Sequence, residues 1–166
     1  MTATYEAIAT TTITTNSATV SFTSISANYT DLILVANVDQ ALGNNSLRFR
    51  FNNDTGANYS ATVVYGNGTS ALSSRFTNET SGLSYASANT ERDSVYILHF
   101  MNYSNATTYK TILSRSNRAS GDVAADVNLW RNTAAINRID LAMGGSFPTN
   151  DFADTTTLTL YGIKAE

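Results

Sequence analysis

Three observations in the sequence predict an all-β fold. Apolar residues recur at every second position, which is the period of a half-buried strand and not of a helix. About ten such segments follow one another along the 166 residues, at intervals of roughly 8–14 residues. Gly- and Asn-rich stretches such as Gly43–Asn45 and Gly66–Gly68 separate them, and these residues tolerate the positive φ of tight turns. We therefore expect an antiparallel two-sheet sandwich or a barrel, in one domain spanning residues 1–166.

Most of the expected strands show this alternation. In chain order they are Tyr5–Ile8, Thr19–Ile25, Leu32–Ala36, Ser46–Phe51, Tyr59–Tyr65, Val95–Met101, Tyr109–Ser114, Asp122–Trp130, Ile136–Met143 and Thr156–Ile163. The pattern is clearest in the fourth, where Leu47, Phe49 and Phe51 point to one face. In the eighth, the apolar face consists of Val123, Ala125, Val127 and Leu129, which we expect to be its buried side.

Two segments are apolar at consecutive positions instead of alternating. They are Leu32–Ala36 and Val95–Met101. A strand that is apolar on both sides suits the centre of a sheet covered on both faces. His99 lies in the second run, on the same face as Val95 and Ile97, and we interpret it as a hydrogen-bonded histidine inside or beside the core.

The stretch Thr69–Asp93 has no clear pattern and is rich in Ser and Thr. Two interpretations are open: one long surface loop, or a pair of short irregular strands. Loops of that length are usually functional.

Charge and composition exclude several classes of function. The net charge is −3 without a Lys/Arg-rich block, which argues against nucleic-acid binding. No apolar run is long enough to span a membrane as a helix. There are no cysteines, one histidine, and none of the common nucleophile, phosphate-loop or dinucleotide motifs. We predict a protein that is not an enzyme and needs no cofactor.

One turn faintly resembles a calcium loop. In Asn52–Gly56, oxygen-bearing side chains alternate before a glycine, but the closing glutamate is missing. A hairpin turn explains the same residues more simply. Asp151 and Asp154 are equally weak metal candidates. We therefore predict no metal site.

Aromatic residues are the best candidates for contact with a partner. Nine tyrosines stand against one tryptophan, and tyrosine offers rigid amphipathic contact area. The candidates are Trp130, Arg131, Tyr103 and Tyr59. Stacking of such rings on sugars is one use, and packing in the core or between subunits is the simpler alternative.

A set of turn and strand-edge motifs runs through nearly the whole chain. They are Ser21–Ile25, Tyr29–Val35, Arg48–Gly56, Asn58–Ser60, Met101–Lys110, Leu129–Arg131, Ala135–Asn137 and Thr157–Lys164. In these motifs the chain resembles short β-rich virion structural proteins of tailed bacteriophages, particularly phages of aquatic and photosynthetic bacteria. The resemblance implies a jelly-roll-like β-sandwich on the outside of a virion, assembled in the host cytoplasm.

The resemblance also implies a function. The leading hypothesis is a non-enzymatic capsid decoration or cement subunit, which stabilises the shell through contacts with other virion proteins. The alternative is the tip of a tail or head fibre that binds a host receptor or surface glycan. By analogy with such proteins, a homo-oligomer, either a trimer or a dimer, is expected. No catalytic residue is carried over.

Overall fold

The protein is a two-layer antiparallel β-sandwich, as the sequence predicts. The computed structural model describes residues 4–39, 43, 45–88, 94–118 and 121–164. These residues form twelve strands, two more than expected, and no helix. No helix that could cross a membrane is therefore found in the described part of the chain.

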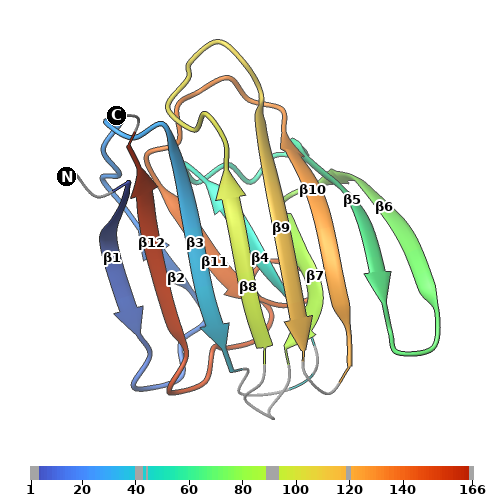
Figure 1. Ribbon diagram of the computed structural model, residues 1–166. Coiled ribbons are helices and arrows are strands. Elements are labelled where there is room, and N and C mark those ends of the chain that lie inside the picture. The colour runs from blue at the N-terminus through green and yellow to red at the C-terminus, as the bar shows by residue number, and fades with distance from the viewer. Residues whose placement is uncertain (1–3, 40–42, 44, 89–93, 119–120, 165–166) are drawn as a thin grey trace.

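The two sheets differ in size (Figure 1). In the larger sheet the eight strands are ordered β1 (Tyr5–Thr12), β12 (Thr157–Ile163), β3 (Asp31–Val38), β8 (Ser94–Phe100), β9 (Lys110–Arg118), β10 (Val123–Trp130), β5 (Tyr59–Gly66) and β6 (Ala71–Glu79). In the smaller sheet the order is β2 (Val20–Phe22), β11 (Ile139–Met143), β4 (Asn45–Phe51) and β7 (Gly82–Ala88).

The order in which strands pair identifies a jelly roll. β1 pairs with β12, β2 with β11, β3 with β8, and β4 with β7, so early strands pair with late ones in a nested series. This is the wrapped hairpin of the jelly roll, and it confirms the predicted fold type. Two further strand pairs, β5–β6 and β9–β10, are inserted between its partners and extend the larger sheet.

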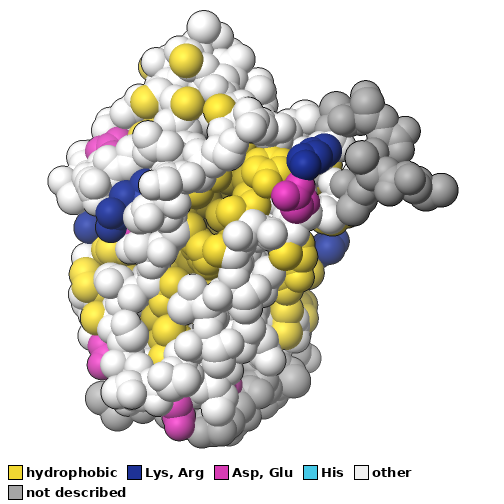
Figure 2. All heavy atoms as spheres, turned by 90° about the vertical axis from the view of Figure 1, so that its left-hand side faces the viewer, with side chains coloured by type: hydrophobic (Ala, Val, Ile, Leu, Met, Phe, Trp, Pro, Cys, Tyr) yellow, Lys and Arg dark blue, Asp and Glu magenta, His cyan; other side chains and the backbone are white. Residues whose placement is uncertain are grey.

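The core lies between the layers and is built from the alternating residues. Leu47, Phe49 and Phe51 on β4 are fully buried, as predicted. Phe100 on β8 meets Phe51 edge-on, with ring centroids 5.7 Å apart, so the aromatic cluster joins the two sheets. Seen from the side on which β1 lies, hydrophobic side chains line the hollow between the layers (Figure 2).

The patternless stretch Thr69–Asp93 consists mainly of two strands, so the long-loop interpretation is wrong. β6 and β7 cover nine and seven residues, and residues 89–93 lie outside the described part. The sequence signal was weak because the buried side of β7 uses small residues such as Ser84 and Ala86. Such residues pack well between layers but do not stand out in a hydrophobic pattern.

The turn Asn52–Gly56 is not a hairpin. It connects β4 of the smaller sheet to β5 of the larger one, so it crosses from layer to layer. Asn52 and Asn53 both have positive φ, at 51° and 60°, a conformation that asparagine tolerates better than most residues.

Gly82 provides a test of how tightly the layers pack. A Cβ at this position would lie 2.1 Å from two atoms of the buried Phe49 ring. We expect Gly82→Ala to lower the free energy of unfolding by about 1–3 kcal/mol, because the ring is enclosed and cannot move aside. Urea unfolding measures the change. Gly145→Ala is the matched control, since its Cβ would find its nearest neighbour 3.9 Å away. Equal stability of the two variants would contradict the packing described.

Candidate contact surface

The outer side of the larger sheet is the most unusual surface of the molecule. At its outward positions β3, β8, β9, β10 and β5 carry aliphatic side chains, and we call this set the aliphatic face. Its members are Ile33, Val35, Val95, Ile97, Leu113, Val123, Val127 and Val64. Five of them are well exposed: Val35 36%, Val64 59%, Leu113 42%, Val123 57% and Val127 50%. In Figure 1 this sheet lies in front, and none of the labelled strands covers it.

Strand register brings the members of the aliphatic face close together, with polar residues of β9 among them. Leu113 on β9 lies directly opposite Val127 on β10. In the next row, Val35 lies opposite Ile97 and Ala125 lies opposite Val64, with the exposed Arg115 of β9 between the two pairs. Neighbouring side chains in such rows are about 5 Å apart across strands, so the aliphatic residues gather on one side of the sheet around Arg115.

Two shallow hollows lie on the aliphatic face. One, of about 210 Å³, is lined by three aliphatic residues, Ile33, Ile97 and Leu113, and by three polar ones, His99, Ser114 and Arg115. The other, of about 380 Å³, lies between β5 and β10 and is bordered by Val64 and Val123. The surface therefore combines protruding valines with one hollow of mixed lining and one that is mainly apolar.

Three ionisable side chains interrupt this face: Arg115 in its middle, and His99 and Asp31 at one end. His99 lies beside Ile33 and Leu113, and its Nε2 is 2.8 Å from Asp31 Oδ2. The predicted hydrogen bond of His99 is thus confirmed, on the outer margin of the sheet and not in the core. Asp31 also accepts a hydrogen bond from the backbone N–H of Asn102. The hydrogen bonds of Asp31 to His99 and to Asn102 hold the end of β8 against β3, so His99 has a structural role.

The expected orientation of β10 is wrong, and its reversal creates much of the aliphatic face. Val123 and Val127 point outward, whereas Asp126, Asn128 and Trp130 point inward and are buried. The physical reason is the backbone edge of β7, which has no strand neighbour beyond it in the smaller sheet. A buried edge needs polar partners, because unpaired N–H and C=O groups are costly away from water.

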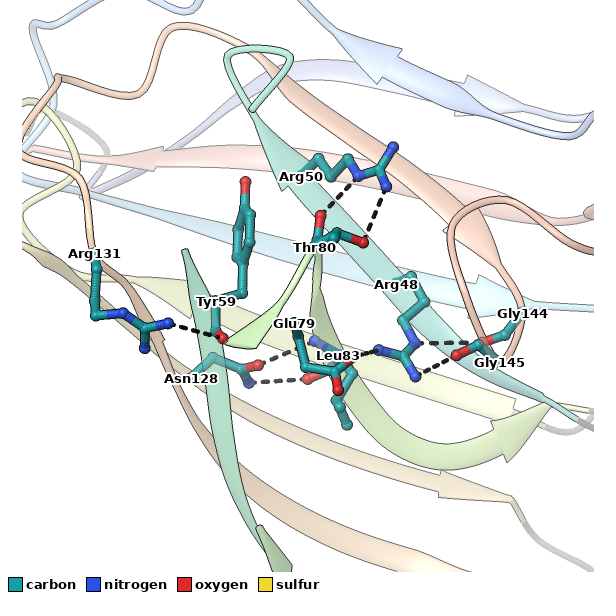
Figure 3. Close-up of polar contacts among 10 residues, drawn as sticks. All are labelled: Arg48, Arg50, Tyr59, Glu79, Thr80, Leu83, Asn128, Arg131, Gly144 and Gly145. Atoms are coloured by element: carbon teal, nitrogen blue, oxygen red, sulfur yellow. Dashed lines mark hydrogen bonds and ion pairs between the residues drawn. The ribbon is translucent and has the colours of Figure 1, made fainter. Parts of the chain in front are cut away.

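Side chains of the larger sheet supply those partners. Asn128 accepts a hydrogen bond from the Leu83 N–H at 3.0 Å and donates one to the Leu83 carbonyl at 2.9 Å (Figure 3). Asp126 accepts a hydrogen bond from the Tyr85 N–H, and Ser116 accepts one from the Ala86 N–H. β10 must turn its polar residues inward to do this, so its valines face outward.

The Asp126 carboxyl titrates unusually because of this position. Burial raises its pKa to about 6, although hydrogen bonds from Ser114, Tyr85 and Ser84 act in the opposite direction. Its Oδ1 has no hydrogen-bond partner, so ionisation inside the sandwich is poorly compensated.

The outer face of the smaller sheet contrasts with the aliphatic face. It is polar, and its cations are held by neighbouring loops. Arg48 donates hydrogen bonds to the carbonyls of Gly144 and Gly145, and Arg50 donates to Thr80 (Figure 3). Arg138 is clamped by Asp140, with its Nε 2.9 Å from both carboxylate oxygens. These contacts fix loops onto the sheet.

Three of the four candidate contact residues lie in the core. Trp130, Tyr59 and Tyr103 are essentially inaccessible to solvent, so their rings cannot stack on a ligand at the surface. Core packing, the simpler alternative, describes them: the rings of Trp130 and Tyr59 are stacked with centroids 6.3 Å apart. Tyr103 donates a hydrogen bond to the Ser26 carbonyl. Each has a polar tip that finds a partner inside the protein.

Arg131 is partly buried and acts as a clamp. Its guanidinium donates to the hydroxyl of Ser60 and to the carbonyl of Ala57. It also donates to the carbonyl of Tyr59 (Figure 3). It therefore holds the start of β5, and a contact role for it remains a prediction.

The turn Asn52–Gly56, which faintly resembles a calcium loop in sequence, is organised around Asp54. Its carboxylate accepts hydrogen bonds from the Trp130 indole at 2.7 Å, from the Asn58 amide and from the Gly56 N–H. Burial alone would raise its pKa, but these hydrogen bonds outweigh burial and lower it. Among the described residues there is no group of three His, Asp or Glu side chains that could hold a metal ion.

Comparison with known proteins identifies no relative: no family model, curated protein or solved structure matches this chain. The aliphatic face is therefore interpreted from its own geometry. In the sequence, the aliphatic face is indicated by the two apolar runs Leu32–Ala36 and Val95–Met101, which have apolar residues on both sides of the strand.

The buried Asp126 carboxyl predicts that the stability of the protein depends on pH. Its pKa is about 6 in the folded protein against 3.8 ordinarily, so between these values the folded state binds more protons. Its contribution to stability is therefore greatest at low pH and falls as pH rises from about 4 to about 6, by up to roughly 3 kcal/mol. We expect Asp126→Asn to remove this fall. Urea unfolding of both proteins at several pH values measures it, with Asp151→Asn as the control. Parallel stability curves for wild type and Asp126→Asn would contradict the prediction.

Trp130 makes a prediction about stability. Trp130→Ala should lower the free energy of unfolding by about 3–5 kcal/mol, because it leaves a large cavity and removes the indole hydrogen bond to Asp54. Tyr109, whose side chain is 56% exposed, is the matched control, and Tyr109→Ala should change stability by less than about 0.5 kcal/mol. Chemical denaturation distinguishes them. A fully stable Trp130→Ala protein would show that the tryptophan is not a core residue.

Proposed function

We propose that this protein is a non-enzymatic subunit on the surface of a phage virion, a capsid decoration or cement protein. It acts by burying the aliphatic face against another protein chain of the particle. The proposal takes the virion setting from the resemblance stated above and the mode of action from this face.

The observation that carries the proposal is the exposed aliphatic face. A monomeric protein seldom leaves a continuous aliphatic patch open to water, and such patches usually mark sites of association. Because the patch is spread over five strands, it suits contact with another protein surface rather than enclosure of a small molecule.

The polar groups of the described residues support the same proposal. Side chains of the kinds used in catalysis, such as Asp126, Asp54 and His99, bond to neighbouring strands and turns. Lys110, although buried, donates to the carbonyls of Thr108 and Thr133. These side chains stabilise the fold through their hydrogen bonds. The proposed function therefore rests on the surface and not on these side chains.

The number of copies on the particle tests this proposal. A decoration subunit follows the symmetry of the shell and should be present on the order of hundreds of copies per particle. Quantitative mass spectrometry of purified particles counts them. A count in the tens or fewer would contradict decoration and favour the fibre-tip alternative.

A variant tests the role of the aliphatic face itself. Val127→Lys should reduce the copies retained on particles, since it places a charge in the middle of the contact. Leu72→Lys is the control: Leu72 is also exposed but lies opposite Tyr65, on the other side of the same sheet from Val64. Equal retention of both variants would contradict a contact role for the face.

A further inference from the structure

The apolar runs of β3 and β8 require cover that one copy of the chain does not supply. Leu34 and Leu98 point inward and are fully buried against the smaller sheet. Ile33, Val35 and Ile97 point outward, where no described strand lies over them. Half of each run thus has its partner within the chain, and the other half has none in the described residues.

We propose that a second copy of this chain covers the aliphatic face, so that two larger sheets pack face to face about a two-fold axis. This inference rests on the proposed function only in treating the face as a contact surface, and it names the occupant. Two-fold pairing is the commonest arrangement of homo-oligomers, and it brings the same patch from both copies together.

The shape of the face favours a copy of itself. Two sheets pack well when their twists match, about 10 Å apart and with strands within about 30° of each other. Two identical sheets have the same twist by construction. The valines that protrude, Val127 and Val123, give each copy knobs, and the hollow lined by Ile33, Ile97 and Leu113 gives each copy a recess.

The area is large enough for a stable pair. Five strands from β3 to β5, about 4.8 Å apart and about seven residues long, cover roughly 550 Å² per copy. Two copies would bury about 1,100 Å², above the roughly 1,000 Å² expected of a biological interface. The flanking positions are mixed, with Thr159 and Tyr161 on β12 and Ser73 and Arg75 on β6.

The charges on the face constrain how two copies can pair. Asp31 is paired with His99, and Arg115 is the charged residue in the middle rows. Arginine can lay its aliphatic stem along an apolar surface, but its guanidinium needs water or a polar partner. The two copies must therefore be offset so that the Arg115 head of each reaches the edge of the contact or a polar group of the other.

Sedimentation velocity of the purified protein tests the proposal. We expect wild type to sediment as a dimer of the 17.8 kDa chain at micromolar concentration. Val127→Lys and Val64→Lys should each weaken the dimer by at least about tenfold, because each change places a charge in the contact from both copies. Both side chains are at least half exposed in the single chain, so far-UV circular dichroism and thermal unfolding should remain those of a folded protein.

Leu72→Lys is the matched control and should remain a dimer. A monomeric wild type at all concentrations would overturn the proposal, as would a trimer or a dimer that Val127→Lys leaves intact. These results are separate from the particle experiment. If wild type alone is monomeric but Val127→Lys is lost from particles, the contact function stands and a different chain covers the face.

Discussion

The buried edge of β7 is the constraint on which the rest of the structure depends. A sandwich of a four-stranded and an eight-stranded sheet leaves this edge facing the larger layer, where water cannot satisfy its backbone. Asn128, Asp126 and Ser116 supply the missing hydrogen bonds from the opposite sheet. The two layers are therefore joined by directional bonds at this side and by aromatic packing around Phe51 near the middle.

This constraint also determines the character of the surface. The inward positions of β10 hold Asp126 and Asn128, which form hydrogen bonds with the backbone of β7. Its aliphatic residues therefore point away from the core. Together with the outward aliphatic residues of β3 and β8 they form a face with an unusual number of exposed aliphatic side chains. A single physical requirement, satisfaction of one strand edge, thus links the internal architecture to the surface that we propose makes contacts.

Much of the fold could be predicted from the sequence. Apolar patterning located ten of the twelve strands, and the period of two correctly placed Leu47, Phe49 and Phe51 in the core, because those residues alternate cleanly with polar ones. It missed β7 because small residues provide its buried contacts, and it missed β6 because none of that strand's residues is fully buried. Of the candidate contact residues, Trp130, Tyr59 and Tyr103 lie in the core. The sequence did not show this, because the identity of an aromatic residue does not tell whether its ring is buried or exposed.

The sequence by itself determined that the chain is all-β, with about ten strands arranged as an antiparallel sandwich or barrel, and it predicted that two strands are apolar on both sides. Local periodicity carries this information, since it depends only on neighbouring residues. Only the tertiary structure decided which side of β10 is buried and which side of the larger sheet is left open. Those outcomes depend on hydrogen bonds between Asn128 and Leu83, which are 45 positions apart in the chain. A local hydrophobic pattern cannot predict contacts between residues so far apart.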